Sequence, residues 1–201
     1  MIFLLLSLIS SYLLGSIPTG YIFGKMLKGI DIREHGSGNV GATNVFRVVG
    51  KVPGIIVLFL DALKGFAAVA LAAGFFYHPS SPINIEWFSI ASGLTAVAGH
   101  IWTIFLKFKG GKGVATGLGA LIAFMHQVAF ACLGVWIIVF SITRIVSIAS
   151  ITASLSLPVF AWVFNRPIEL KILSVILCII SIYKHIPNIK RLLKGEEKKL
   201  F

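Results

Sequence analysis

The chain has 201 residues, of which 57% are hydrophobic and only 12% charged, about half of the charged share of an ordinary soluble domain. This composition excludes a soluble fold, and long apolar runs that do not alternate exclude a membrane β-barrel. The formal net charge of +11 does not indicate a nucleic-acid partner, because the lysines and arginines lie in short segments between apolar runs. The sequence therefore predicts an all-α integral membrane protein.

Seven apolar runs are candidate membrane-spanning helices, since a span needs about 20 residues or fewer inside a bundle. They are residues 2–24, 54–76, 85–106, 113–126, 128–143, 147–164 and 168–184. The division between the fourth and fifth runs rests only on Met125, His126 and Gln127. A five- or six-span arrangement stays open if one segment is re-entrant. We expect a single transmembrane domain over residues 1–201, without an internal repeat.

Basic residues predict the orientation of these spans. With the N-terminus outside, 15 of the 18 lysines and arginines fall on the cytosolic side. Arg166 and Lys171 fall outside, and Lys64 lies within a span. This asymmetry follows the positive-inside rule. It predicts a seven-helix bundle with a cytosolic C-terminus, so that three polar segments at the ends of apolar runs share the cytosolic side.

The first polar segment covers residues 37–47. It combines glycine and alanine with five polar candidates for substrate contact: Ser37, Asn39, Thr43, Asn44 and Arg47. If residues 41–47 are helical, Asn44 and Arg47 share a face, and the guanidinium can hold an anion in its fork. The alternative is a plain loop followed by a helix cap.

An acidic and a basic residue lie three apart in the second apolar run. Charges within a membrane are costly, and they are usually paired or functional. Asp61 and Lys64 are therefore either a self-contained ion pair, or Lys64 adds charge to an anion pocket while Asp61 holds it in place.

The second polar segment contains Gly110, Gly111, Lys112 and Gly113 just before an apolar run. Glycine lets backbone N–H groups approach a phosphate, and the lysine and the N-terminus of the next helix favour an anion. No hydroxyl residue follows Lys112, so the segment is not a Walker A loop. The alternative is a cytosolic turn. We expect His100 and Trp102 to pack near this loop.

The third polar segment brings His185 and Asn188 three residues apart, around Pro187. Proline suits the first turn of a helix, so a short interfacial helix is expected to begin here and to stop at Gly195. Glu196 and Glu197 follow in a basic tail, where one of them can clamp basic side chains.

In this order, the three segments resemble the bacterial acyl-phosphate-dependent glycerol-3-phosphate acyltransferases. The likeness is carried by SGNVGATNVFR (37–47), GGKGVAT (110–116) and HIPNIKRLLKGE (185–196). With the spacing and the seven-span layout, it covers essentially the whole chain.

The resemblance implies an enzyme of the bacterial plasma membrane with a cytosol-facing site. Glycerol 3-phosphate would receive a fatty acyl group from an acyl phosphate, giving lysophosphatidic acid and phosphate. Ser37, Arg47, Lys112, His185 and Asn188 would form the active site. The Gly110–Gly113 loop would bind glycerol 3-phosphate, and Glu196 would be structural.

The residues suit this chemistry, because both substrates are anionic and an acyl phosphate is already activated. The base is either His185 or a substrate phosphate. No Gly-x-Ser-x-Gly motif occurs, so we expect direct transfer. No cluster of metal-ligating residues is visible in the sequence, and we expect neither a metal nor a cofactor. Two other classes stay open: an organic-phosphate transporter, and a structural membrane subunit.

Overall fold

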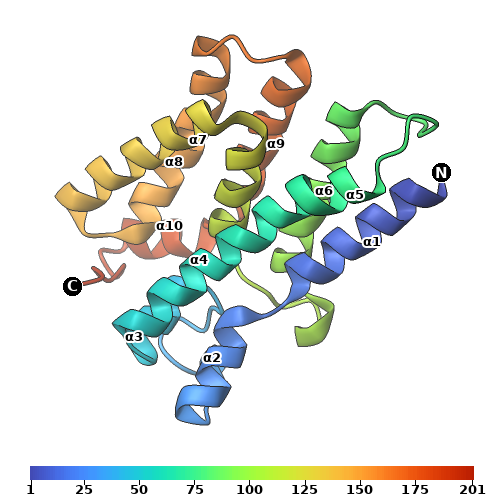
Figure 1. The fold of residues 1–201 in the computed structure, drawn as a ribbon. Coiled ribbons are helices and arrows are strands. Elements are labelled where there is room, and N and C mark those ends of the chain that lie inside the picture. The colour runs from blue at the N-terminus through green and yellow to red at the C-terminus, as the bar shows by residue number, and fades with distance from the viewer. The chain divides into compact units, whose positions relative to one another are not determined.

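The computed structural model describes residues 1–71 and 73–201, and every regular element in them is helical (Figure 1). This confirms the predicted all-α class. The chain divides into two compact units, Met1–Ala123 and Phe124–Phe201. Each unit is described by itself below.

The first predicted span is broken in two at a proline. α1 (Ile2–Ser16) ends just before Pro18, and α2 (Thr19–Lys28) begins just after it. The break leaves carbonyl groups without helical partners, which is costly in an apolar environment. Two side chains satisfy them: Thr103 Oγ1 donates to Ser16 O at 2.6 Å, and Lys64 Nζ donates to Ile17 O at 2.9 Å.

α1 packs closely along α6 (Ile85–Ile101) in the first unit. A Cβ atom on Gly15 would overlap the backbone of Ala96, so only glycine allows this approach. A hydrogen bond of 2.8 Å joins the hydroxyls of Ser7 and Ser92 across the same contact. Small residues on α1 thus fix the position of α6.

The first polar segment is anchored to the start of the next long helix. The elements around it are η1 (Ile32–Glu34), α3 (Ala42–Val48), α4 (Lys51–Ala67), η2 (Ala68–Ala73) and α5 (Gly74–Phe76). A buried apolar cluster lies beneath the segment, formed by Ile32, Val40, Val45, Val49, Val57 and Leu106. Burial of these side chains supplies the main free energy that holds the segment against α4.

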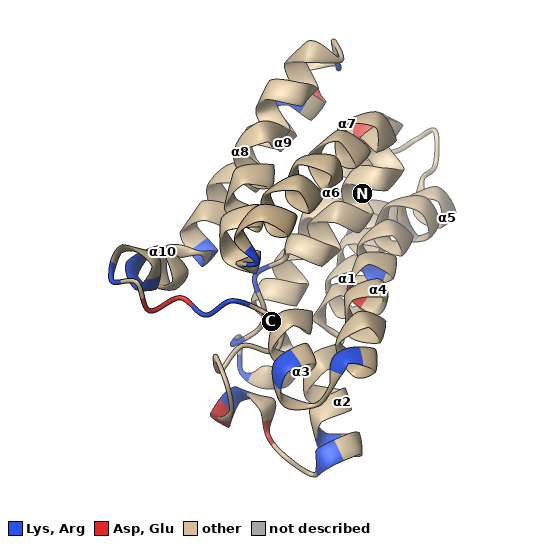
Figure 2. Ribbon diagram, turned by 90° about the vertical axis from the view of Figure 1, so that its left-hand side faces the viewer, with Lys and Arg blue, Asp and Glu red and all other residues tan. Residues whose placement is uncertain are grey.

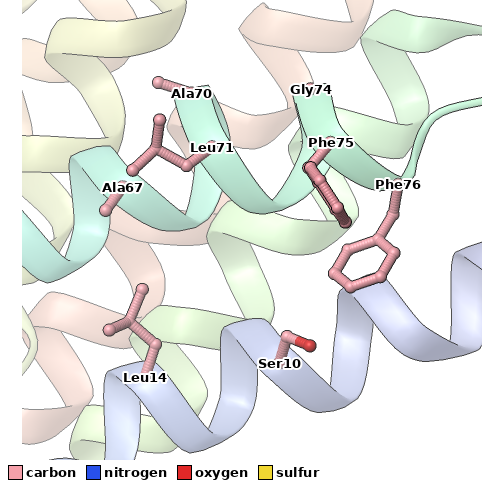
Figure 3. Close-up of a pocket in the computed structure, with 8 residues that line it drawn as sticks. All are labelled: Ser10, Leu14, Ala67, Ala70, Leu71, Gly74, Phe75 and Phe76. Carbon is pink, nitrogen blue, oxygen red and sulfur yellow. The ribbon is translucent and has the colours of Figure 1, made fainter.

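An apolar groove of about 680 Å³ lies between α1 and the α4–η2–α5 stretch (Figure 3). Ser10 and Leu14 line it from α1, and the rings of Phe75 and Phe76 line it from the other side. This lining offers no charged group to an anionic substrate. The polar segments therefore remain the candidates for phosphate chemistry.

A short connection leads from α6 to a long helix. It contains η3 (Ile104–Leu106), with Lys107 and Phe108 both in the left-handed backbone region. α7 (Val114–Thr143) follows, and its backbone is non-helical at Met125, with φ −151° and ψ 67°. The sequence predicted the division between the fourth and fifth spans within residues 125–127, and the break lies at the first of these residues.

The second unit contains the later part of α7 with α8 (Val146–Val163), α9 (Ile168–Lys184) and α10 (Ile186–Leu193). Trp136 Nε1 donates to Ser150 Oγ at 3.1 Å and so joins α7 to α8. The hydroxyl oxygens of Ser154 and Ser181 lie 2.7 Å apart, and this hydrogen bond joins α8 to α9. Polar contacts of this kind hold apolar helices in register.

Within the described part of the chain, five helical stretches are long and apolar enough to cross a membrane. A sixth arises if α9 and α10, which meet at a bend of 55°, count as one span. The sequence predicted seven. The numbers differ because this criterion counts α7 once despite its break and leaves out α9 alone, which has 17 residues.

Basic residues are concentrated near a few of the helices (Figure 2). In the first unit, most of them lie where α2 and α3 are found, away from the N-terminus. In the second unit, α10 and the tail after it carry the densest group. Each of these groups lies at one of the polar segments that the sequence analysis singled out.

Candidate active site

Asn44 holds the loop of the first polar segment together. Its amide nitrogen donates to Ile32 O at 3.1 Å and His35 O at 3.0 Å, and its amide oxygen accepts from Ser37 N at 2.8 Å. The side chain is buried. Both amide donors are therefore occupied by the protein's own backbone. These bonds give Asn44 a structural role, and the substrate contact that the sequence predicts for it stays a prediction.

An ion pair shapes the start of the same loop. Arg33 Nη2 lies 2.6 Å from Asp31 Oδ2, and Arg33 Nε also donates to this carboxylate. Hydrogen bonds from Arg33 lower the pKa of Asp31 to about 2, against a smaller opposing effect of burial. The Asp31 carboxylate thus stays ionised at neutral pH and also accepts the backbone N–H of Arg33, which starts η1.

The other candidates of this segment lie near the surface of the first unit. Ser37 is exposed, while Thr43 and Arg47 are half-buried on α3, so that the helix considered for residues 41–47 is present from Ala42 to Val48. Asn39 Oδ1 accepts the N–H of Gly41 at 2.8 Å, directly before the helix. Asn39 thus contributes to the turn that leads into α3.

Asp61 and Lys64 form the predicted ion pair within α4. Lys64 Nζ lies 2.8 Å from Asp61 Oδ1, and the two side chains are only 5% and 2% exposed, respectively. Thr19 Oγ1 also donates to Asp61 Oδ1, at 2.6 Å. Since Lys64 donates to Ile17 O as well, the charges are compensated within the protein. This geometry favours the self-contained pair of the two alternatives.

Two glycines of the second polar segment allow close packing. Gly110 N donates to Ile101 O and Gly111 N donates to His100 O, each at 3.0 Å. The phosphate contact that the sequence predicts for this loop stays a prediction. A Cβ atom at Gly110 would overlap His100 O, and one at Gly111 would overlap the His100 ring. The two glycines thus allow the loop to lie against the end of α6.

Lys112 and Gly113 form the final approach to α7. Lys112 is half-buried, and Gly113 has φ +83°, a conformation that glycine adopts without strain. α7 begins at the next residue, as predicted, so that its N-terminal amides and the lysine lie at one place. This is an arrangement that attracts anions.

His185 lies between α9 and α10 in the second unit, buried to 2% exposure. Its Nδ1 is 2.8 Å from Ser181 O, an atom that can only accept a hydrogen bond. Nδ1 therefore carries the proton, and in the neutral ring Nε2 has the basic lone pair. This is the protonation pattern that a general base requires.

A glutamate fixes Asn188, and of the two acids in the tail it is Glu197. Glu197 Oε1 accepts from Asn188 Nδ2 at 2.6 Å and from Ser147 Oγ at 2.7 Å, and Oε2 accepts from Arg191 Nε at 2.6 Å. The Glu196 side chain is exposed. Glu196 and Glu197 are neighbours in the sequence. The turn at Gly195, whose φ is +69°, determines that Glu197 is the one that faces Asn188.

Burial works to raise the pKa of Glu197. The hydrogen bonds from Asn188, Ser147 and Arg191 outweigh that effect and hold the pKa below the ordinary glutamate value. Glu197 is thus ionised at neutral pH. Among the described residues, no group of three or more histidine, cysteine or acidic side chains could hold a metal ion.

The family model for glycerol-3-phosphate acyltransferases matches residues 5–195. A glycerol-3-phosphate acyltransferase of Prochlorococcus marinus is 48% identical over 197 residues, which are 96% of this chain and 95% of that protein. One of Thermosynechococcus vestitus is 47% identical over 199 residues, which are 98% of this chain and 94% of that protein.

The chain belongs to the glycerol-3-phosphate acyltransferase family. The prediction made from the three polar segments is therefore confirmed at the level of the family.

Solved structures of this family have the same fold. A crystal structure of PlsY (YgiH), an integral membrane glycerol 3-phosphate acyltransferase in its glycerol 3-phosphate form, matches with a TM-score of 0.88. It is 44% identical, and the match covers 98% of this chain and 94% of that one. The lysophosphatidic acid form of the same protein matches with a TM-score of 0.85. This chain is accordingly an integral membrane protein.

Proposed function

We propose that this protein transfers a fatty acyl group from an acyl phosphate to glycerol 3-phosphate. The products are 1-acyl-glycerol 3-phosphate (lysophosphatidic acid) and inorganic phosphate, and the reaction is a first step of phospholipid synthesis. The observation that carries the proposal is the match along the whole chain to an enzyme solved in both glycerol 3-phosphate and lysophosphatidic acid forms.

The candidate residues carry the chemical groups that the reaction needs. We assign Arg47 and Lys112 to the substrate phosphates, with Ser37, Asn39 and Thr43 as polar contacts and Gly113 at the entry to α7. A glycerol hydroxyl oxygen attacks the carbonyl carbon, a new C–O bond forms, and the bond from that carbon to the phosphate oxygen breaks. Inorganic phosphate leaves with its charge neutralised by the basic side chains.

The hydroxyl proton passes to His185 Nε2 or to a substrate phosphate. The first route is supported by the hydrogen bond between Nδ1 and Ser181 O, which fixes Nε2 as the acceptor in the neutral ring. Asn188, held by Glu197, orients the groups around the ring. No residue of the protein forms a covalent bond with the acyl group, so we place Ser37 as a ligand of the substrate.

We further propose a bacterial plasma membrane location, with the N-terminus outside and the polar segments in the cytosol. The distribution of basic residues supports this orientation. With α7 crossing as two short spans on either side of Met125, the chain has seven spans in one functional domain. A membrane location also suits the acyl phosphate, whose apolar chain partitions into lipid.

The test is an assay of the purified protein in detergent with both substrates and with EDTA present. We expect lysophosphatidic acid and phosphate in equal amounts, and neither product when glycerol 3-phosphate or acyl phosphate is omitted. Phosphate release without an acylated product would contradict the proposal. Glycerol 3-phosphate accumulating unacylated in sealed vesicles would indicate a transporter instead.

A further inference from the structure

A buried polar cluster lies behind the second polar segment, within the first unit. Its centre is Asp61, whose Oδ1 is 2.8 Å from Lys64 Nζ and accepts from Thr19 Oγ1 at 2.6 Å. Lys64 continues to Ile17 O, at the break between α1 and α2. The cluster thus joins α1, α2 and α4 with charged groups that are almost fully buried.

His100 connects this cluster to the loop that carries Lys112. Its Nδ1 lies 3.6 Å from Asp61 Oδ1, and the residue is 7% exposed near the end of α6. On the opposite side of the ring, Nε2 lies against Gly111, so closely that a Cβ atom there would overlap it. The backbone oxygen of the same histidine accepts the N–H of Gly111 at 3.0 Å. One residue therefore supports the loop with both its ring and its backbone.

We propose that His100 is a positioning residue for Lys112, and that Asp61 holds its ring in place. The ring forms the platform on which Gly111 rests, and this platform sets where the next residue, Lys112, meets the substrate phosphate. The inference rests on the proposed function, because it assumes that Lys112 binds glycerol 3-phosphate. In this proposal, the buried charges of Asp61 and Lys64 contribute to substrate binding without contacting the substrate.

The chemistry of the cluster explains why charged groups are used here. Burial of Asp61 and Lys64 is costly, and an apolar pair of similar volume would often be equally stable. A carboxylate that faces Nδ1 restricts the rotation of the imidazole, which apolar packing would allow. The position of the loop decides whether Lys112 reaches the substrate phosphate. A displacement of about 1 Å is enough to slow a reaction strongly.

The first experiment measures turnover and both Michaelis constants for His100→Ala and Asp61→Asn. We expect the Michaelis constant for glycerol 3-phosphate to rise about tenfold, because a phosphate contact is displaced. The constant for acyl phosphate should change much less. The exposed His78 gives a matched control, and His78→Ala should behave as the wild type. An unchanged constant for glycerol 3-phosphate in folded His100→Ala protein would overturn the proposal.

The second experiment does not depend on the stability of the charged cluster. Gly111→Ala is made in the wild type and in His100→Ala protein, since the three atoms nearest to the new methyl group all belong to the imidazole ring. The wild-type background should lose affinity for glycerol 3-phosphate by at least about fivefold, and the His100→Ala background should show almost no additional loss. Equal losses in both backgrounds would contradict the proposed platform.

Gly110→Ala is the matched control for this cycle. A methyl group at Gly110 overlaps backbone oxygens of His100 and Ile101, which remain when the imidazole is removed. The loss of affinity for glycerol 3-phosphate caused by Gly110→Ala should therefore be the same in both backgrounds. Relief of Gly110→Ala by His100→Ala would show a general loosening of the loop and would contradict a specific role of the ring.

Two outcomes of these experiments separate this inference from the proposed function. If the wild type makes lysophosphatidic acid and Lys112→Ala weakens glycerol 3-phosphate binding while the His100 variants do not, the positioning role is wrong and the function stands. If the wild type makes no lysophosphatidic acid, the proposed function itself has failed.

Discussion

At the scale of single residues, Lys112 is the basic side chain whose position most favours phosphate binding. It is half-buried at the N-terminus of α7, where the helix dipole attracts anions. We predict that Lys112→Ala raises the Michaelis constant for glycerol 3-phosphate about 10- to 100-fold, the value of a hydrogen bond to a charged group. Steady-state kinetics check this.

Lys109 provides the control for that variant. It lies in the same loop with an exposed side chain, so Lys109→Ala should bind glycerol 3-phosphate as the wild type does. If the two lysine variants behave alike, the effect comes from the overall charge of the loop, and the assignment of Lys112 to the phosphate is wrong.

His185 should affect turnover more than binding. We predict that His185→Ala lowers kcat by about 10²- to 10⁴-fold if its Nε2 accepts the hydroxyl proton. His126 is exposed and serves as the control, since His126→Ala should keep wild-type turnover. A His185→Ala protein with wild-type kcat would leave a substrate phosphate as the base.

At the scale of the elements, Glu197 ties the tail to α8 through Ser147 and to α10 through Asn188. We predict that Glu197→Ala lowers the free energy of unfolding by about 1–3 kcal/mol, because three donors lose a shared acceptor. Glu196→Ala should have no such effect. Thermal unfolding in detergent compares the two variants, and equal destabilisation would contradict the assignment of the clamp to Glu197.

The same clamp should depend on pH. The folded state lowers the pKa of Glu197, so its stabilising effect is present above the ordinary glutamate value of about 4.5 and is lost as the pH falls through the lowered pKa. We predict that the wild type loses stability on acidification in this range. Glu197→Gln should show less of this loss, and an identical acid profile would contradict the prediction.

The sequence predicted those elements whose determinants are local. Asn44 and Arg47 lie on a helix, Gly195 follows the end of α10, and Asp61 meets Lys64 one turn away. In each case, residues within one or two turns decide the geometry.

Other features required the fold, because their partners are distant in the chain. Asn44 donates to Ile32 O, and Lys64 donates to Ile17 O across 47 positions. The sequence predicted a phosphate role for the N–H groups of Gly110 and Gly111, and only the fold shows that the end of α6 accepts their hydrogen bonds. A glycine-rich run in the sequence does not distinguish close packing from ligand binding.

At the scale of the whole molecule, the proposed orientation can be tested by cysteine labelling. Ser80 lies in an exposed loop between α5 and α6, and Lys194 follows α10 with an exposed side chain. We predict that an impermeant thiol reagent labels Ser80→Cys in intact cells and labels Lys194→Cys only after the membrane is opened. The native cysteines, Cys132 and Cys178, are buried and give a low background. The reverse pattern would contradict a cytosolic site.

The central claim is that this membrane protein moves an acyl group to glycerol 3-phosphate through attack at the carbonyl carbon of the acyl phosphate. Its most direct test uses acyl phosphate labelled with ¹⁸O at the oxygen that bridges carbon and phosphorus. Attack at the carbonyl carbon leaves this oxygen on phosphate, so we predict labelled inorganic phosphate and unlabelled lysophosphatidic acid. Labelled fatty acid together with phosphorylated glycerol 3-phosphate would mean attack at phosphorus and would contradict acyl transfer.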